Sequence, residues 1–181
     1  DIYINNAFSC SHRKQASIHN ITKFVKKSFA GPLLKKEIDA INLVVKNKKE
    51  PVTCIIGGSK ISSKINVITS LIEKVNNLII VGAMANNFFI YKNYKVGKSL
   101  IEENTKEIIK KIYEKANKNK CKILIPEDCM VGSSFDGYGI NKDLNAIKDN
   151  DIILDIGPKT ILNIKDIIDQ SNTVLWNGPA G

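Results

Sequence analysis

The chain has 181 residues, with 27 basic and 18 acidic side chains and a formal net charge of +9 at pH 7. Its hydrophobic content of 43% and charged content of 25% exclude a disordered or fibrous protein. The longest apolar run, 78–85, is too short for a membrane helix of about 20 residues, so we expect no membrane partner.

Lysine dominates the basic residues, because Arg13 is the only arginine and the other 26 are lysines. Proteins that recognise nucleic acid by geometry favour arginine, whose rigid guanidinium can form two parallel bonds to an anion. A nucleic-acid-binding domain would also need aromatic side chains among its basic clusters, whereas aromatic residues here are scattered and make up 7%. We therefore interpret the net positive charge mainly as a compositional bias toward lysine on solvent-exposed faces, and we expect no nucleic-acid partner.

Four cysteines are spread along the chain without a C-x-x-C pair: Cys10, Cys54, Cys121 and Cys129. This spacing indicates neither a zinc site nor a disulfide framework, and buried reduced thiols are typical of a cytosolic protein. We therefore expect a cytoplasmic location and no metal held by side chains alone. Because the chain begins with Asp1 and lacks a signal pattern, we expect a processed chain or a fragment.

The first elements predicted are a strand, a polar loop and a helix. Asp1–Asn5 alternates apolar and polar residues, as a strand does, and a loop over 6–17 follows. Pro32 suits the first turn of a helix, which residues 47–51 end. The apolar residues of this helix recur at helical spacing: Leu34, Ile38, Ile41 and Val45. Because this helix separates the opening segment from the rest, we place a domain boundary there.

From Val52 onward, strand patterns alternate with helix patterns. Strands are expected at 52–56, 78–81, 122–125, 129–131, 152–156 and 173–176. Helices are expected at 61–75, 84–91, 101–118 and 160–170, and a polar loop at 135–150. Such alternation predicts right-handed β-α-β units and an α/β fold with a doubly wound, Rossmann-like parallel sheet.

Four of the expected strands run directly into glycine-containing turns, which begin at Gly57, Gly82, Gly157 and Asn177. Ligands of open α/β sheets bind beyond the carboxyl ends of the strands. Glycine lets a ligand approach the backbone, and the helix that follows can offer unpaired N–H groups to an anion. Ordinary strand-to-helix turns would look the same at any one position, but four turns on one expected edge favour a ligand site.

The turn after the first of these strands holds two lysines, Lys60 and Lys64. Their spacing at an expected helix start predicts that both ammonium groups project from one face beside the glycines. The Walker A spacing is absent. A site for a nucleotide triphosphate is the functional interpretation, and a solvated lysine face is the alternative.

His12 and Arg13 lie together in the loop after the first strand. A guanidinium can clamp a carboxylate or phosphate there. His12 could act as a base, although a loop histidine is more often a hydrogen-bonding or packing residue.

These motifs resemble the phosphoglycerate kinase family. Residues 1–17 resemble its D-V-[FY]-V-N-D-A-F-G-T-A-H-R segment, and 56–64 resemble its G-G-[AS]-K-V-[SA]-x-K signature. Further blocks match in the family's order at 30–37, 84–88, 97–100, 155–160 and 176–179. Among the departures, Asn6 replaces an aspartate and Ala83 a glycine. The family's G-G-G-D-T loop is missing, so we expect an internal fragment that is inactive alone.

The resemblance implies reversible phosphoryl transfer between Mg·ATP and 3-phosphoglycerate, giving ADP and 1,3-bisphosphoglycerate, in a monomer. It implies the end of a phosphoglycerate-binding domain at 1–29, an interdomain hinge helix at 30–50 and a nucleotide-binding domain at 51–181. The cofactors implied are ATP or ADP and Mg²⁺, which is held mainly through the nucleotide phosphates. A non-catalytic nucleotide- or phosphate-binding module remains the alternative.

The resemblance also implies roles for individual residues. Arg13, with His12 beside it, would bind phosphoglycerate, Lys60 would contact the nucleotide phosphates, and Lys64 would contact the transferred phosphoryl group. Arg13 and Lys64 are thus the expected catalytic residues. The nucleotide cleft would further be lined by Gly58, Ser59, Gly82, Ala83, Gly157, Asn177, Gly178 and Ala180.

Overall fold

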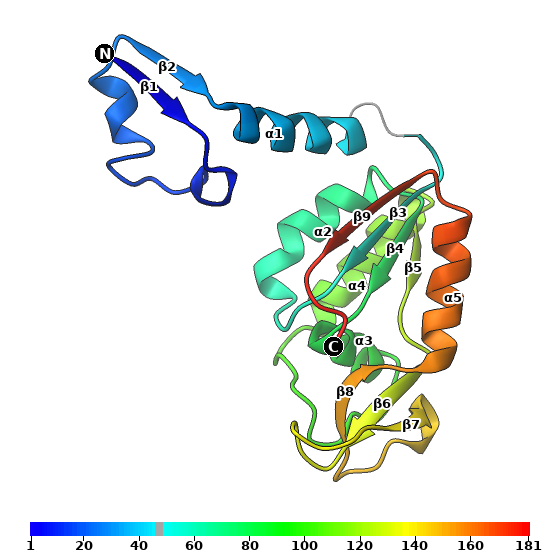
Figure 1. Ribbon diagram of the computed structural model, residues 1–181. Helices are drawn as coiled ribbons and strands as arrows, with labels where there is room; N and C mark the ends of the chain where they lie inside the picture. The colour runs from blue at the N-terminus through cyan, green and yellow to red at the C-terminus, as the bar shows by residue number, and fades with distance from the viewer. Residues whose placement is uncertain (46–48) are drawn as a thin grey trace. The chain divides into compact units, whose positions relative to one another are not determined.

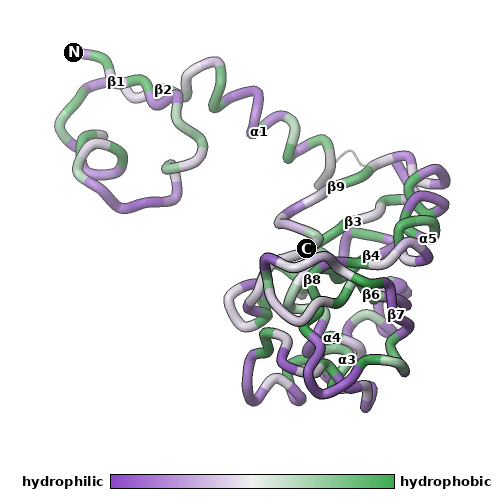
Figure 2. The backbone as a smooth tube through the Cα atoms, turned by 60° about the horizontal axis from the view of Figure 1, so that its bottom comes forward, coloured by the Kyte–Doolittle hydropathy of each residue, from purple (hydrophilic) through white to green (hydrophobic). Residues whose placement is uncertain are grey.

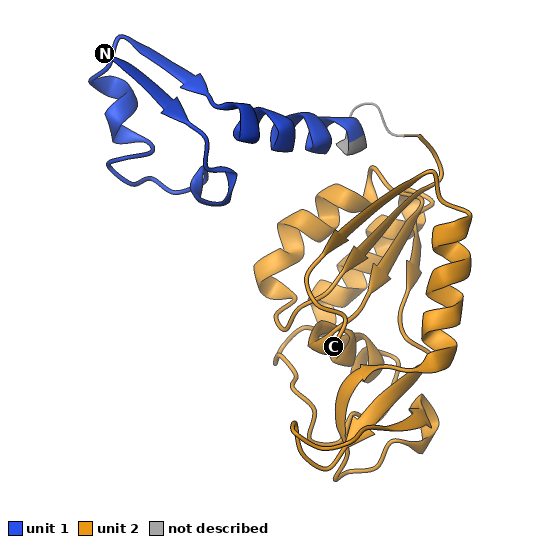
Figure 3. Ribbon diagram, viewed as in Figure 1, with its two compact units in different colours: residues 1–48 blue, residues 49–181 orange. Residues whose placement is uncertain are grey.

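The computed structural model describes residues 1–45 and 49–181. The chain forms two compact units, Asp1–Lys48 and Lys49–Gly181 (Figure 3). The hinge expected at 30–50 falls partly on residues 46–48, which lie outside the described residues, and its role stays a prediction.

Unit 1 contains a two-stranded parallel sheet and a helix. β1 (Ile2–Asn5) pairs with β2 (Lys27–Ala30), and α1 spans Pro32–Val45. Two short 3₁₀ helices, η1 (Phe8–Cys10) and η2 (Asn20–Lys23), lie in the connection. The predictions of β1 and α1 are confirmed. β2 was not predicted, since all four of its side chains are exposed and no buried face marks it in the sequence.

Helix α1 is capped by a side chain from the preceding loop. Asn6 Oδ1 accepts hydrogen bonds from the backbone N–H groups of Leu33 (2.7 Å) and Leu34 (3.3 Å). These donors have no partner within the helix, so the amide satisfies them. A Cβ atom at Gly31 would lie 2.5 Å from the same oxygen, which explains the glycine before the helix.

The apolar face predicted on α1 is largely open in this chain. Leu34 is buried, but Ile38 and Ile41 are 41% and 44% exposed. The side chain of Val45, the fourth member of the face, lies outside the described set. The helical spacing therefore predicted the helix correctly, but the rest of unit 1 leaves much of its apolar face exposed.

Unit 2 is built on a four-stranded parallel sheet with the order β5-β4-β3-β9 (Figure 1). The strands are β3 (Val52–Ile56), β4 (Asn77–Ile80), β5 (Lys122–Leu124) and β9 (Thr173–Asn177). All five residues of β3 are buried. This agrees with a central strand that is covered on both faces and whose sequence is mostly apolar rather than alternating, with Thr53 as its one polar residue.

Helices cover both faces of this sheet. Cys54 and Ile80 lie in the larger core with α2 (Ile65–Ile72), α3 (Ala83–Tyr91) and α4 (Lys106–Lys118). Ile55, Ile79 and Val81 lie in a second cluster with apolar residues of α5 (Pro158–Asp169), whose hydrophobic and hydrophilic segments alternate in Figure 2. Successive strand residues thus face opposite layers, and the predicted doubly wound α/β fold is confirmed.

Two of the expected strands, at 129–131 and 152–156, do not join the parallel sheet. β8 (Ile152–Ile156) pairs antiparallel with β6 (Asp128–Gly132), which pairs antiparallel with β7 (Ile140–Asp143) on its other side. β7 and the 3₁₀ helix η4 (Leu144–Ala146) occupy much of the predicted 135–150 loop. Only one of the four β7 side chains is even partly buried, so its sequence carries no strand pattern. The prediction that β8 belongs to the same parallel sheet as β3, β4 and β9 is wrong.

Two predicted helices begin later than expected. The segment before α2 forms a 3₁₀ helix, η3 (Ser62–Lys64), and α4 begins at Lys106 instead of 101. In both places tertiary contacts hold the chain before the helix begins: Ile61 is fully buried in the core, and the Glu102 backbone N–H donates to Asn87 Oδ1 of α3 (3.0 Å).

Cys54, Cys121 and Cys129 are buried free thiols, and Cys10 is half-buried and free. Burial raises the pKa of Cys54 to about 12, with a smaller contribution from Cys121. The buried thiols are therefore neutral packing residues at physiological pH, as predicted.

Candidate functional site

The glycine turns after β3, β4 and β9 meet at one edge of the parallel sheet. The Gly57 N–H donates to Asn177 O (2.8 Å), and the Gly82 N–H donates to Ala180 O (2.9 Å). The Met84 N–H donates to Gly58 O (2.8 Å). The three segments therefore form one bonded backbone platform at the carboxyl ends of the strands, which is where ligands of open α/β sheets bind.

Glycine is required on this platform because the backbones approach too closely for a side chain. A Cβ atom at Gly57 would lie 1.8 Å from Pro179 O. At Gly178, whose φ is +88°, a Cβ atom would lie 2.4 Å from Gly57 O. Gly82 has φ +68° and would meet the Gly58 backbone nitrogen at 2.9 Å. The surface beyond the strand ends thus consists of backbone atoms that a ligand can approach.

Lys64 reaches into the middle of this platform. Its Nζ donates to Gly57 O (2.8 Å) and to Asn177 Oδ1 (2.8 Å), which belong to two different turns. Both acceptors are neutral, and among the described residues no carboxylate forms an ion pair with Lys64. A half-buried ammonium group held by neutral oxygens leaves its positive charge available to an anionic ligand.

Lys60 and Ser59 lie on the exposed turn that precedes η3. The prediction that Lys60 and Lys64 share one helix face is wrong, because Lys60 lies before the 3₁₀ helix and Lys64 is its last residue. Ile61, which is fully buried between them, anchors the turn in the core and separates the two lysines.

A cavity of about 330 Å³ adjoins the platform and is mostly apolar. Gly82, Ala83 and Ala180, all expected site residues, lie in its wall. The sequence did not identify the other wall residues, which include Asn86, Phe89, Leu100, Phe135 and Leu154. Apolar side chains are common throughout the chain, and only the fold shows which of them line a cavity.

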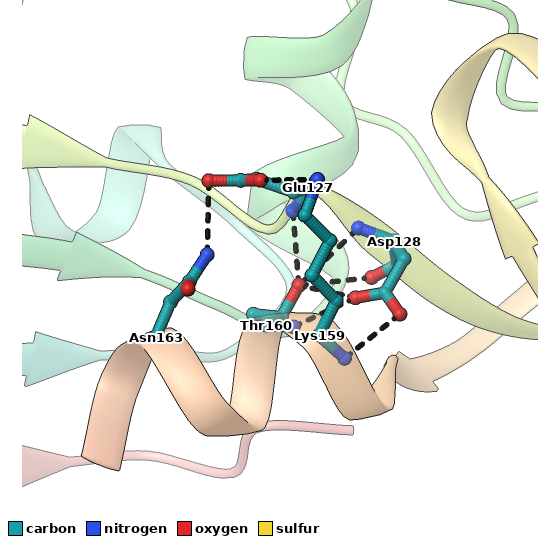
Figure 4. A network of polar contacts seen from close by, with 5 residues as sticks. All are labelled: Glu127, Asp128, Lys159, Thr160 and Asn163. Atoms are coloured by element: carbon teal, nitrogen blue, oxygen red, sulfur yellow. Dashed lines mark hydrogen bonds and ion pairs between the residues drawn. The ribbon is translucent and has the colours of Figure 1, made fainter. Parts of the chain in front are cut away.

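The turn at Gly157 differs from the other three because the carboxylate of Asp128 lies against it: a Cβ atom at Gly157 would lie 2.2 Å from Asp128 Cγ. Figure 4 shows this carboxylate beside Lys159 and Thr160. Asp128 accepts hydrogen bonds from the backbone N–H groups of Lys159 (3.0 Å) and Thr160 (2.8 Å) and from Thr160 Oγ1 (2.7 Å). The first free N–H groups of α5 are therefore satisfied within the protein. The expectation that they would bind an anion is wrong, and a role for Gly157 in the nucleotide cleft stays a prediction.

Asp128 is held as a carboxylate even though it is only 1% exposed. Burial by itself would raise its pKa, but hydrogen bonds from Thr160, Lys159 and Asn141 outweigh burial and leave the pKa below the usual aspartate value. The neighbouring Glu127 adds further contacts at this helix start. It forms an ion pair with Lys159 Nζ (2.8 Å) and accepts a hydrogen bond from Asn163 Nδ2 (3.0 Å).

Replacing Asp128 should destabilise unit 2. We expect Asp128→Ala to lower the free energy of unfolding by about 2 to 4 kcal/mol at pH 7, because the buried N–H groups and hydroxyl lose their acceptor. Since the folded-state pKa is depressed, this difference should persist above the ordinary aspartate pKa and shrink as the pH falls through the lowered value. Urea unfolding from pH 7 to pH 3 measures it, with the exposed Asp136→Ala as control. Equal stability of wild type and Asp128→Ala at pH 7 would contradict the capping role.

His12 and Arg13 lie in unit 1, in the loop after η1, and both are exposed. The Arg13 backbone N–H donates to Cys10 O (3.0 Å), and Ser11 Oγ donates to Phe8 O (2.7 Å). The loop is thus folded back on η1, while the imidazole and guanidinium groups stay accessible to a ligand.

Among residues 1–45 and 49–181, no group of three or more His, Cys, Asp or Glu side chains is placed to hold a metal ion. Within the same residues, no helix is both long and apolar enough to cross a membrane.

Comparisons with known proteins agree on one family. A family model described as phosphoglycerate kinase matches residues 1–181. Phosphoglycerate kinases of Wolbachia pipientis wMel and Bartonella quintana (strain Toulouse) are 48% and 42% identical over 182 and 183 residues. The matches cover 100% of this chain and 46% of each relative, so the chain spans about half the length of the curated relatives it matches.

The fold is also similar to a solved structure described as phosphoglycerate kinase from Coxiella burnetii. The TM-score is 0.90 at 35% sequence identity, with 100% of this chain and 47% of that chain covered.

Proposed function

Because the chain belongs to the phosphoglycerate kinase family, we propose that it is part of an enzyme that transfers a phosphoryl group reversibly between Mg·ATP and 3-phosphoglycerate. In this proposal unit 2 carries the nucleotide and the loop of His12 and Arg13 contributes to binding of 3-phosphoglycerate. The observation that carries the proposal is the position of Lys64, which joins the glycine turns after β3 and β9.

The platform suits the chemistry of phosphoryl transfer. This reaction needs positioned reactants and positive charge against the phosphoryl oxygens more than it needs covalent help from the protein. Lys64 would contact the transferred group, and the exposed Lys60 would contact the other nucleotide phosphates. Backbone atoms of Gly58, Gly82 and Gly178, all with positive φ, would lie against the nucleotide.

The adjoining cavity suits a nucleotide base. Its apolar wall can cover the faces of a heterocycle, while Gly82, Ala83 and Ala180 connect it to the platform. Ser59, Asn177 and Gly157 complete the proposed cleft. In this proposal Mg²⁺ would be held mainly by the nucleotide phosphates and would neutralise their charge.

A coupled assay of the longer protein that contains this chain tests the proposal. We expect ATP-dependent turnover of 3-phosphoglycerate by the longer protein and no measurable turnover by residues 1–181 alone. A longer protein that binds Mg·ADP but produces no 1,3-bisphosphoglycerate would instead be the non-catalytic binding module. Turnover by the 181-residue chain alone would contradict the expectation that residues outside this chain are needed to complete the site.

A further inference from the structure

We propose that Glu102 is a positioning residue. It fixes the lysine loop, residues 59–64, which carries Lys60 and Lys64, and thereby sets the affinity for the nucleotide. This inference rests on the proposed function. Glu102 lies in the segment between α3 and α4, forty residues along the chain from Ser62, and no sequence motif pointed to it.

The contacts of Glu102 fall on the middle of the lysine loop. Its carboxylate accepts a hydrogen bond from the Ser62 backbone N–H (3.1 Å) and another from the Ser62 hydroxyl. Ser62 lies two residues from both Lys60 and Lys64, in the short 3₁₀ helix that ends at Lys64. Two bonds from one carboxylate to one residue fix both its backbone and its side chain.

Glu102 is itself held from the core. Its backbone N–H donates to Oδ1 of Asn87 (3.0 Å), a residue of α3 that is only 2% exposed. Thr105 Oγ1 also donates to this oxygen (3.3 Å). The carboxylate is therefore tied through its own backbone to a packed helix and can transmit that rigidity to Ser62.

The loop needs such support because its remaining anchors are few. Ile61 is buried in the core, and Lys64 donates to the turns after β3 and β9, but Ser62 and Ser63 are exposed. Within the part of the chain that the structure describes, the Ser63 hydroxyl bonds inside the loop, to Lys60 O (2.9 Å). Glu102 thus joins the exposed middle of the loop to the segment between α3 and α4.

The carboxylate is ionised at neutral pH. Hydrogen bonds from the Ser62 hydroxyl and backbone lower the pKa of Glu102, with a smaller contribution from the charge of Lys60. Glu102 therefore remains an acceptor across the physiological range, and the support of the loop does not depend on pH there.

Variants of the longer protein test this role through separate kinetic constants. We expect Glu102→Ala to raise KM for Mg·ATP about tenfold, because small displacements of positioned groups are costly, while KM for 3-phosphoglycerate and the melting temperature stay near wild type. The matched control is Glu103→Ala, which removes the neighbouring exposed glutamate. Glu102→Gln keeps a hydrogen-bonding side chain of the same length and should stay within about threefold of wild type.

A double-mutant cycle with Ser62→Ala locates the effect. If Glu102 acts through Ser62, the double variant should be no worse than Glu102→Ala alone. The inference is overturned if Glu102→Ala matches Glu103→Ala, if Glu102→Gln is as impaired as Glu102→Ala, or if the two effects add. An inactive wild-type protein would instead overturn the proposed function, so the two failures are distinguishable.

Discussion

Replacing Lys64 by alanine in the longer protein should lower kcat by about 10³-fold or more, the loss that follows removal of a cation from a phosphoryl transition state. Lys64 is the ammonium group that joins the turns after β3 and β9, and its two partners are neutral oxygens. Its charge is therefore free to stabilise the negative charge that develops on the transferred group. The loss should appear in kcat because this stabilisation is greatest in the transition state.

Two comparisons separate this role from a general effect of charge. Lys64→Arg keeps the charge but changes its geometry, so we expect activity between wild type and Lys64→Ala. Lys110→Ala removes an exposed lysine of α4 and should leave kcat unchanged. If Lys64→Ala retained near wild-type turnover in the coupled assay, the assignment of Lys64 would be wrong.

Replacing Gly57 by alanine should disrupt the platform itself. The added Cβ atom would lie 1.8 Å from Pro179 O, which is a backbone atom and cannot rotate away. The turns after β3 and β9 must then separate, which moves Gly57 O away from Lys64 Nζ. We expect affinity for Mg·ADP to fall by at least about 100-fold, because every proposed phosphate contact depends on this geometry.

Gly137→Ala is the matched control for this substitution. Its new Cβ atom would come nearest to the side chain of Ser134, at 3.1 Å, in an exposed loop between β6 and β7. A rotation of the serine hydroxyl relieves that contact, so nucleotide affinity should stay near wild type. Gly57→Ala with unchanged affinity for Mg·ADP would show that the platform does not bind the phosphates.

The sequence predicted the alternating part of the fold well because its buried strands are distinct. Val52–Ile56 is a short, mostly apolar segment with a majority of β-branched residues, and two glycines follow it, which together favour a buried strand over a helix. β2 and β7 were missed because most of their side chains are exposed, so burial did not shape their sequences. The partners of β8 could not be inferred, since an apolar strand carries no sign of whether its neighbour runs parallel or antiparallel.

The candidate site could be predicted only where chemistry and backbone conformation select the residue. Gly82 and Gly178 need positive φ, and Lys64 stands beside such turns, so their residue types carry information. Glu102 and Asp128 are ordinary acidic residues in the sequence. Their contacts with Ser62 and Thr160 join positions 40 and 32 residues apart, and only the fold reveals them.

The most direct test asks whether the ends of β3, β4 and β9 hold the nucleotide. The longer protein, as wild type and as Gly57→Ala, is titrated with Mg·ADP in parallel. Calorimetry gives both dissociation constants, and the affinity for 3-phosphoglycerate reports whether the rest of the protein is intact. The predicted result is a large loss of Mg·ADP affinity in Gly57→Ala with 3-phosphoglycerate affinity unchanged. Equal Mg·ADP affinities for the two proteins would contradict the account.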